Sequence, residues 1–224
     1  MLEETVLDHG LVRLVDSMGS DLSISRSARV SYDAAWRAGE DKGSDARLIN
    51  YLYANGHNTP FESVEVQFEI KAPIFVFRQW HRHRTQSYNE VSARYTELSE
   101  EFYVPELDQI TTQSKDNKQM RTKVQHPNSA RLQNIIKGSN HSSFMNYKTL
   151  MAEGCPRELA RSVLPVGTYS HMFAKANLHN WFKFLAERLH PHAQYEIRVY
   201  AEVILKMLET VAPAAVAAFN KNRG

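Results

Sequence analysis

Residues 64–95 read VEVQFEIKAPIFVFRQWHRHRTQSYNEVSARY, a stretch that joins two apolar segments to a dense polar one. From Val64 to Lys71, apolar residues alternate with polar ones, which predicts a half-buried strand with one wet face. Pro73 opens a new segment, and a proline at the first position allows a helix over the apolar run Ile74 to Trp80. The sequence therefore predicts a strand and a second apolar segment that together deliver residues 82–95 to one place.

The polar segment contains three arginines, a histidine, a carboxylate, an amide and two serines. Arginine is suited to planar, bidentate capture of phosphate. Arginine-rich runs are also often solvated faces or nonspecific nucleic-acid patches. A solvated face, however, does not need Ser92 and Arg94 at a fixed distance from Arg82, nor the neutral Asn89 beside Glu90. We therefore expect a binding site for an anionic ligand.

The same segment resembles the signature of the flavin-dependent thymidylate synthases. That signature reads R-H-R-x-x-S-x-N-x-x-S-x-R, and the chain matches every fixed position from Arg82 to Arg94. Four further segments resemble family segments in the family's order: residues 29–31 (RVS), 56–62 (GHNTPFE), 156–165 (PRELARSVLP) and 192–198 (HAQYEIR). The resemblance thus extends over most of the chain.

The resemblance implies conversion of dUMP to dTMP. In that reaction 5,10-methylenetetrahydrofolate supplies the carbon, NADPH supplies the hydride and FAD carries it. The resemblance also implies an α/β (α+β) fold of one domain over residues 1–224, with a largely antiparallel sheet flanked by helices. A homotetramer with flavin sites at the subunit interfaces is expected by the same analogy. The sequence pattern by itself supports only mixed α and β structure in one domain.

Arg188 is the first candidate for a catalytic residue, because the family places an arginine there against the pyrimidine. Negative charge that builds on uracil would be stabilised as in an oxyanion hole. Ser92 is a second candidate, but an unactivated serine hydroxyl is a weak nucleophile, which favours a role as nucleotide ligand. Arg94 and Arg161 match phosphate-binding positions. The resemblance assigns these residues to the dUMP site: Gln79, Trp80, His81, Arg82, Glu90, Val91, Ser92, Ala93, Arg94, Arg161 and Arg188.

The FAD site implied by the resemblance draws on several segments. It comprises Ser31, His57, Thr59, Glu62, Arg82, His83, Arg84, Thr85, Asn89, Glu90, Asn177, His179, Lys183 and His192. At the positions of Asn177, His179 and Lys183 the family often has Asn, Arg and Asn, which tend to hold the adenine end of FAD. Only Asn177 matches that pattern. His179 and Lys183 differ from it but can still donate hydrogen bonds. No glycine-rich dinucleotide fingerprint is present, and FAD binding cannot rest on a Rossmann turn.

Other interpretations of these residues remain open at this point. The basic motif could bind nucleic acid with Tyr88 and Tyr95 as stacking partners. A metal-dependent hydrolase could use His57, His83, His190 and His192, although no metal site is expected from their spacing. Arg161 and Arg188, on predicted helices, are also typical of surface ion-pair residues. Cys155 is a tempting nucleophile, but a lone cysteine is more often a small buried or loop residue, and the matching family does not use one.

Composition limits the class of protein. A length of 224 residues with 42% hydrophobic and 23% charged residues is typical of one globular domain. A net charge of +2 argues against a dedicated nucleic-acid binder. The single cysteine excludes an internal disulfide framework. We find no apolar run long enough for a membrane span and no secretory signal at residues 1–4, so we expect a cytoplasmic protein without a membrane partner.

Periodicity, caps and breakers predict the remaining segments. We expect a strand over Leu11–Val15 and Val166–Ala176, and helices over Leu22–Val30, Ala46–Asn55, Phe144–Ala152, Arg157–Leu164, Leu178–Leu189 and Ala193–Val211. Thr85–Arg94 is expected to be the irregular loop of the site. Residues 106–140 are polar and short of large apolar side chains, and we expect them to be peripheral or mobile.

Overall fold

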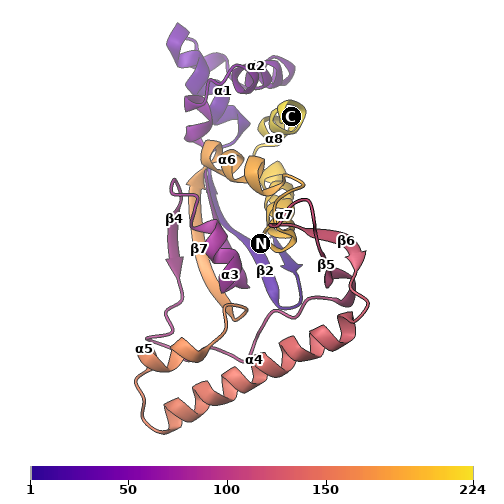
Figure 1. Cartoon of the computed structure of the whole chain (residues 1–224). Coiled ribbons are helices and arrows are strands. Elements are labelled where there is room, and N and C mark those ends of the chain that lie inside the picture. Colours follow the sequence, from indigo (N-terminus) through magenta and orange to yellow (C-terminus); the bar gives the residue numbers. More distant parts are fainter. Residues whose placement is uncertain (1, 224) are drawn as a thin grey trace.

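A five-stranded antiparallel sheet with the order β1-β2-β3-β7-β4 runs through the centre of the molecule (Figure 1). The structure is a computed structural model, and it describes residues 2–223. The strands are β1 (Glu3–Val6), β2 (Gly10–Met18), β3 (Glu65–Pro73), β7 (Tyr169–Asn177) and β4 (Ser87–Glu90). The expected mixed α/β fold with a largely antiparallel sheet is therefore present.

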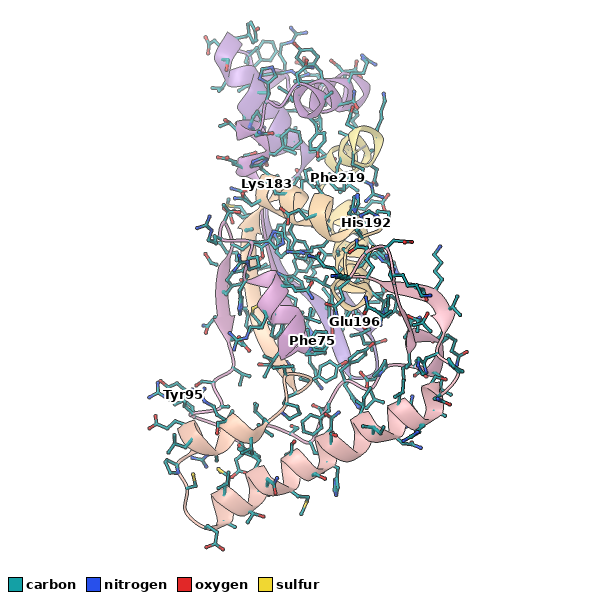
Figure 2. All side chains as sticks on the ribbon, in the orientation of Figure 1. Phe75, Tyr95, Lys183, His192, Glu196 and Phe219 are labelled. Atoms are coloured by element: carbon teal, nitrogen blue, oxygen red, sulfur yellow. The ribbon has the colours of Figure 1, made fainter. Side chains whose placement is uncertain are left out.

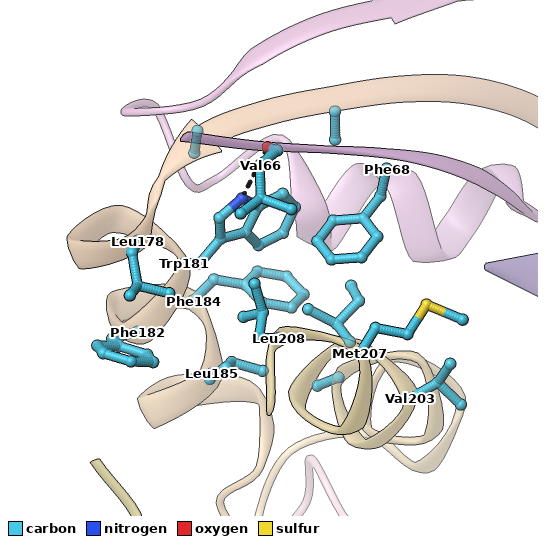
Figure 3. Packing of buried hydrophobic residues seen from close by; sticks show 14 of the residues in the cluster. Val66, Phe68, Leu178, Trp181, Phe182, Phe184, Leu185, Val203, Met207 and Leu208 are labelled. Atoms are coloured by element: carbon cyan, nitrogen blue, oxygen red, sulfur yellow. Dashed lines mark hydrogen bonds between the residues drawn. The ribbon is translucent and has the colours of Figure 1, made fainter. Parts of the chain in front are cut away.

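Strand β3 occupies the middle of the sheet, as its alternating sequence predicts. Val66, Phe68 and Ile70 are at most 1% exposed and face the helices. Two of these helices are α6 (Leu178–Arg188) and α7 (Tyr195–Val211). Figure 3 shows how Trp181 of α6 enters this layer, where its Nε1 donates a 3.1 Å hydrogen bond to the Val66 carbonyl. The sheet and these two helices thus form the main hydrophobic core.

Helix α3 (Ile74–Trp80) follows β3 without a loop and confirms the expected helix after Pro73. Val76, Phe77 and Trp80 form its buried face. Trp80 is fully buried, and its Nε1 donates to Oε1 of Gln86 at 3.0 Å. This contact ties the end of α3 to the polar segment, so the strand and helix together fix where the signature motif begins.

The part of the motif expected to be an irregular loop contains a strand instead. Residues 87–90 form β4, which pairs with β7 at the edge of the sheet. Tyr88 points back toward α3, and its hydroxyl donates to the carbonyls of His83 at 2.7 Å and Trp80 at 3.1 Å. Four residues with one large apolar side chain are too short for periodicity to reveal a strand. The motif is therefore held on both sides, by α3 and by β7.

Residues 106–140 lie at the periphery, as expected, since only Ile110, Ser129 and Asn140 among them are buried, but they form regular secondary structure. They contain the two-stranded sheet of β5 (Thr111–Gln113) and β6 (Arg121–Gln125) and the start of α4 (Ser129–Ala152). The helix expected over Phe144–Ala152 is only the last part of this 24-residue helix. Because α4 buries just three residues, Ser129, Asn140 and Tyr147, its sequence carries little apolar periodicity.

The other elements mostly match the sequence pattern. They are α1 (Asp21–Arg29), α2 (Lys42–Ala54) and α5 (Arg157–Ala160), with α8 (Pro213–Asn222) as an element not expected from the sequence. Helices α1, α2 and α8 gather at the end of the molecule opposite α4 (Figure 1). Phe219 of α8 stacks on Phe182 of α6 with ring centroids 4.9 Å apart. None of the helices in residues 2–223 has the length and apolarity that crossing a membrane requires.

Candidate active site

A pocket of about 720 Å³ lies between α3, the segment after β4 and the segment around α5. Helix α3 contributes Ile74, Phe77, Arg78 and His81, which share one face because they are three and four residues apart. Six residues that the resemblance assigns to the dUMP site line this pocket: His81, Glu90, Val91, Ser92, Ala93 and Arg161. The structure therefore brings six of the eleven residues assigned to the dUMP site to one cavity, four of them from the signature motif.

The pocket combines guanidinium groups with carboxylates and hydroxyl groups. Arg161 lines it and donates only a 3.4 Å hydrogen bond to the Glu158 carbonyl. Arg94 does not line the pocket, but its Nε lies 3.6 Å from the exposed carboxylate of Glu158, which does. Glu90 accepts a 2.8 Å hydrogen bond from the Ser170 hydroxyl. Such a set suits a phosphorylated ligand with hydroxyl groups.

Arg78 is a pocket residue that the sequence analysis missed. It is exposed, lines the cavity and makes no side-chain hydrogen bond or ion pair with any residue between 2 and 223. Its position three residues before His81 on one helix could have revealed it. An unpaired guanidinium at the cavity adds a further cation for an anionic ligand.

A second group of predicted site residues lies away from this pocket, where the end of α6 meets the end of α3. Nε of Arg188 donates to Nε2 of His83 at 2.9 Å, and its Nη2 donates to the Gln79 carbonyl at 3.2 Å. Burial, followed by the positive charge of Arg188, lowers the pKa of His83 to about 4. His83 is therefore neutral at neutral pH, with Nε2 as an acceptor and the proton on Nδ1.

The residues assigned to the dUMP site thus occupy two places within one chain. Arg188 and Gln79 do not line the pocket that contains Ser92. Trp80 exposes none of its side chain and packs on Phe184, with ring centroids 4.5 Å apart. The side chain of Trp80 is therefore a core group rather than a ligand contact.

Ser92 has no base that could activate it. Its hydroxyl accepts a 3.3 Å hydrogen bond from the Arg94 backbone and makes no hydrogen bond to a histidine or lysine side chain within the described chain. Cys155, half-buried after α4, has its sulfur 3.8 Å from the Pro156 carbonyl and does not line the pocket. Nucleophilic catalysis thus finds little support at either residue.

Several residues that the resemblance assigns to FAD lie along the open face of α6. His179, Lys183 and Glu187 are spaced four residues apart and line up on that face. Burial and then Lys183 lower the pKa of His179, whereas the nearby Glu62 raises it. The positive charge of Lys183 also acts on His83. A row of polar groups therefore extends from Glu62 toward Arg188. Figure 2 labels Lys183 at its place on α6.

The amide of Asn177 has a structural partner in the fold. Its Oδ1 accepts a 2.9 Å hydrogen bond from the backbone N–H of Asn180, which caps the first turn of α6. Its Nδ2 remains available to a ligand. Asn177 therefore has a structural role at the start of α6.

The first and last arginines of the R-H-R triplet are exposed. Neither Arg82 nor Arg84 makes a side-chain hydrogen bond or ion pair within residues 2–223. The other residues assigned to FAD in exposed positions are Ser31, His57, Thr59, Glu62, Thr85, Asn89, Glu90, Lys183 and His192. Exposed guanidinium groups without carboxylate partners fit a ligand that carries a pyrophosphate. These residues therefore fit FAD chemically.

A metal site is not formed by the histidines. In the part of the chain that the structure describes, no three His, Cys, Asp or Glu side chains come together to hold a metal ion. His190 and His192 lie side by side with ring centroids 4.8 Å apart, but no third ligand joins them. The histidine-metal hydrolase interpretation therefore has no site in residues 2–223.

Comparison with known proteins gives consistent matches over nearly the whole chain. Residues 13–214 match the model of a family described as thymidylate synthase complementing protein. A flavin-dependent thymidylate synthase from Ehrlichia ruminantium (strain Gardel) is 45% identical over 218 residues, which cover 97% of this chain and 72% of the relative. The chain belongs to the flavin-dependent thymidylate synthase family. Another family member, from Treponema denticola, is 45% identical over 222 residues, covering 98% of this chain and 82% of the relative.

Solved structures confirm the fold of this flavin-dependent thymidylate synthase. A UMP/dUMP methylase, PolB from Streptomyces cacaoi, was solved with 5-Br dUMP and superposes with a TM-score of 0.88 at 34% identity, covering 98% of both chains. The structure of the same methylase with 5-Br UMP gives a TM-score of 0.86 at 33% identity, covering 98% of this chain and 97% of that one. The sheet and helices described above are thus the family fold.

Proposed function

We propose that this flavin-dependent thymidylate synthase methylates dUMP to dTMP, with 5,10-methylenetetrahydrofolate as carbon donor, NADPH as reductant and FAD as hydride carrier. The observation that carries the proposal is the pocket lined by residues 90–93 of the signature motif and by Arg161. The similar methylase that was solved with 5-Br dUMP supports a pyrimidine nucleotide as its occupant.

The pocket supplies what a nucleotide monophosphate needs. Arg161 and Arg94 would bind the dianionic phosphate, with Arg78 as an additional cation and Ser92 as a neutral donor. Glu90, oriented by its 2.8 Å hydrogen bond from Ser170, would accept from a sugar hydroxyl. The phosphate and sugar would thereby fix the nucleotide before any chemistry occurs.

The complete site requires a second copy of the chain. Gln79 and Arg188 do not line the pocket of their own chain, although the resemblance assigns both to dUMP. An assembly in which Arg188 and Gln79 of one copy face the pocket of another copy would bring all the assigned residues together. This division supports the homotetramer, with its sites at subunit interfaces, as part of the proposal.

FAD, when bound, supplies the transfer of hydride from NADPH to the nucleotide. Arg82 and Arg84, which have no side-chain partner within residues 2–223, would neutralise its negative charge, and the open face of α6 with His179 and Lys183 would hold its adenine end. Glu62 lies at a further position matched to FAD. The row of polar groups from Glu62 to His83 supports this placement.

Uracil activation would be electrostatic in this proposal. Arg188, held by His83 and the Gln79 carbonyl, would stabilise the negative charge that develops on the pyrimidine. Cys155 lies outside the pocket, and Ser92 has no base to remove its proton. Neither side chain is therefore assigned a covalent step.

The test is an assay of dTMP formation by the purified protein with dUMP, methylenetetrahydrofolate, NADPH and FAD. We expect dTMP only when all four are present, and we expect Cys155→Ser and a metal chelator to leave the rate unchanged. Formation of dTMP by protein from which all flavin has been removed, or loss of activity in Cys155→Ser, would contradict the proposal. UMP should be assayed in parallel, because the similar methylase is named for both nucleotides and was solved with both bromo analogues.

A further inference from the structure

Glu196 is a buried carboxylate in the first turn of α7, with 2% of its surface exposed (Figure 2). One of its oxygens, Oε1, accepts hydrogen bonds from the Tyr103 hydroxyl and from Nη2 of Arg121, each at 3.0 Å. The other, Oε2, accepts from Nε2 of Gln194 at 2.7 Å. Burial, and then the charge of Glu196, raise the pKa of Tyr103 well above its ordinary value, so the phenol stays a donor.

The carboxylate sets the direction of a chain of hydrogen bonds. An ionised carboxylate only accepts, so the Gln194 amide must turn its NH2 toward Glu196. Its carbonyl oxygen, Oε1, then faces Gln79 and accepts from Nε2 of that residue. Gln79 must consequently turn its own carbonyl oxygen away from Gln194. An acceptor-only group thus determines the orientation of an amide two residues along the hydrogen-bond chain.

This series of hydrogen bonds leads to Arg188. The backbone carbonyl of Gln79 accepts from Nη2 of Arg188 at 3.2 Å. Contacts from α7 therefore fix the side-chain orientation of Gln79, and a contact from α6 fixes its backbone. We call the residues Glu196, Gln194 and Gln79 the amide relay.

We propose that Glu196 is a positioning residue that acts through the amide relay: it makes Gln79 present its side-chain carbonyl oxygen to a hydrogen-bond donor of the bound pyrimidine nucleotide. The inference rests on the proposed function, in which Gln79 contacts dUMP. Glu196 itself touches no ligand. Its negative charge matters because a neutral amide in its place could donate to Gln194 and reverse the relay.

A double-mutant cycle on the flavin-loaded protein tests this inference. Glu196→Gln keeps the shape of the side chain but removes the acceptor-only constraint, and Gln79→Ala removes the end of the relay. We expect Glu196→Gln to weaken dUMP binding about tenfold, a difference of about 1.4 kcal/mol. In the Gln79→Ala background, Glu196→Gln should have no further effect, because coupled residues are not additive. Dissociation constants come from titration calorimetry.

The matched control is Glu202→Gln on the same helix. Glu202 is exposed and lies 3.8 Å from Arg198, outside the relay, so its substitution should leave dUMP affinity unchanged. If Glu196→Gln lowers the melting temperature, Gln194→Met replaces it in the cycle, because Gln194 is exposed and its substitution interrupts the relay while Oε1 of Glu196 keeps its hydrogen bonds from Tyr103 and Arg121. The same tenfold loss and the same non-additivity with Gln79→Ala are then expected.

Additive effects, or unchanged affinity in both relay variants, would overturn the inference. If the unmodified protein makes dTMP but the effects of the two substitutions are additive, the proposed function remains and only the role of Glu196 is contradicted. An unmodified protein that binds no dUMP overturns the proposed function, and the inference with it.

Discussion

Nε of Arg188 lies 2.9 Å from Nε2 of His83 and donates a hydrogen bond to it, which joins the end of α6 to the second residue of the signature motif. A protonated His83 could not accept this bond, because both ring nitrogens would then be donors. The free energy of unfolding should therefore depend on pH through His83. The direction of this pH dependence follows from the lowered pKa of His83.

The stability of the fold should decrease below pH 6.5 because of His83. Its pKa is about 4 in the folded protein and 6.5 in an unfolded chain, so the unfolded state binds the extra proton between these values. The contribution is fully present above pH 6.5 and is lost as pH falls toward 4. It amounts to at most on the order of 3 kcal/mol. Chemical denaturation at a series of pH values measures it.

His83→Gln is the matched variant for this pH dependence. The amide oxygen can accept from Arg188 but does not titrate in this range. We expect the difference in unfolding free energy between the two proteins to change steadily from pH 6.5 to pH 4. If the unfolding free energies of the two proteins changed in parallel over that pH range, His83 would not have a lowered pKa.

Arg188→Lys should lower kcat for dTMP formation about 100- to 1000-fold, the usual effect of removing one donor that stabilises developing negative charge. Lysine keeps the charge but cannot donate to His83 and the Gln79 carbonyl in the fixed geometry of a guanidinium. Steady-state kinetics measure the effect. Arg47→Lys, at an exposed position of α2, is the control and should not change kcat. A kcat within threefold of the unmodified protein would remove Arg188 from the catalytic role.

Ser92→Ala should raise KM for dUMP about 10- to 100-fold and leave kcat measurable. Loss of a hydrogen bond to a charged group costs about 1.5–3 kcal/mol, which corresponds to that range. The expectation follows from a Ser92 hydroxyl that lines the pocket but has no base beside it. A kcat reduced to background, with nucleotide binding intact, would instead identify Ser92 as a nucleophile.

Leu185→Ala should destabilise the protein by about 2–5 kcal/mol, the range for removing a leucine side chain from a packed core. Leu185 is fully buried between α6 and α7, as Figure 3 shows. Leu159→Ala on α5 is the matched control, because Leu159 is 60% exposed, and it should cost less than about 0.5 kcal/mol. Equal effects on the midpoint of urea denaturation would contradict the assignment of the core.

The sequence predicted the elements whose burial is periodic and missed those that are short or little buried. Strand β3 and helix α7 show clear apolar periodicity because each packs one face against the core. Helix α4 packs little surface, and strand β4 is four residues long, so neither produced a readable pattern. Strand β4 depends on its pairing with β7, a tertiary contact that the local sequence does not encode.

The candidate site was predictable as a set of residues but not as an arrangement. The family resemblance pointed to Ser92, Glu90 and Arg161, which do line one pocket. It could not reveal that Trp80 is a core residue, since an aromatic at the end of an apolar helix fits either role. Nor could it reveal that Arg188 lies outside the pocket of its own chain, because such distances depend on how α6 packs against α3.

The most direct test of the central claim is the visible absorption spectrum of the purified protein without oxygen, before and after NADPH and then dUMP. We predict flavin bands that bleach with NADPH, and a change in the flavin bands when dUMP is added, because the nucleotide would lie beside the flavin. A protein that cannot be reconstituted with FAD and whose spectrum ignores dUMP would contradict the proposed function.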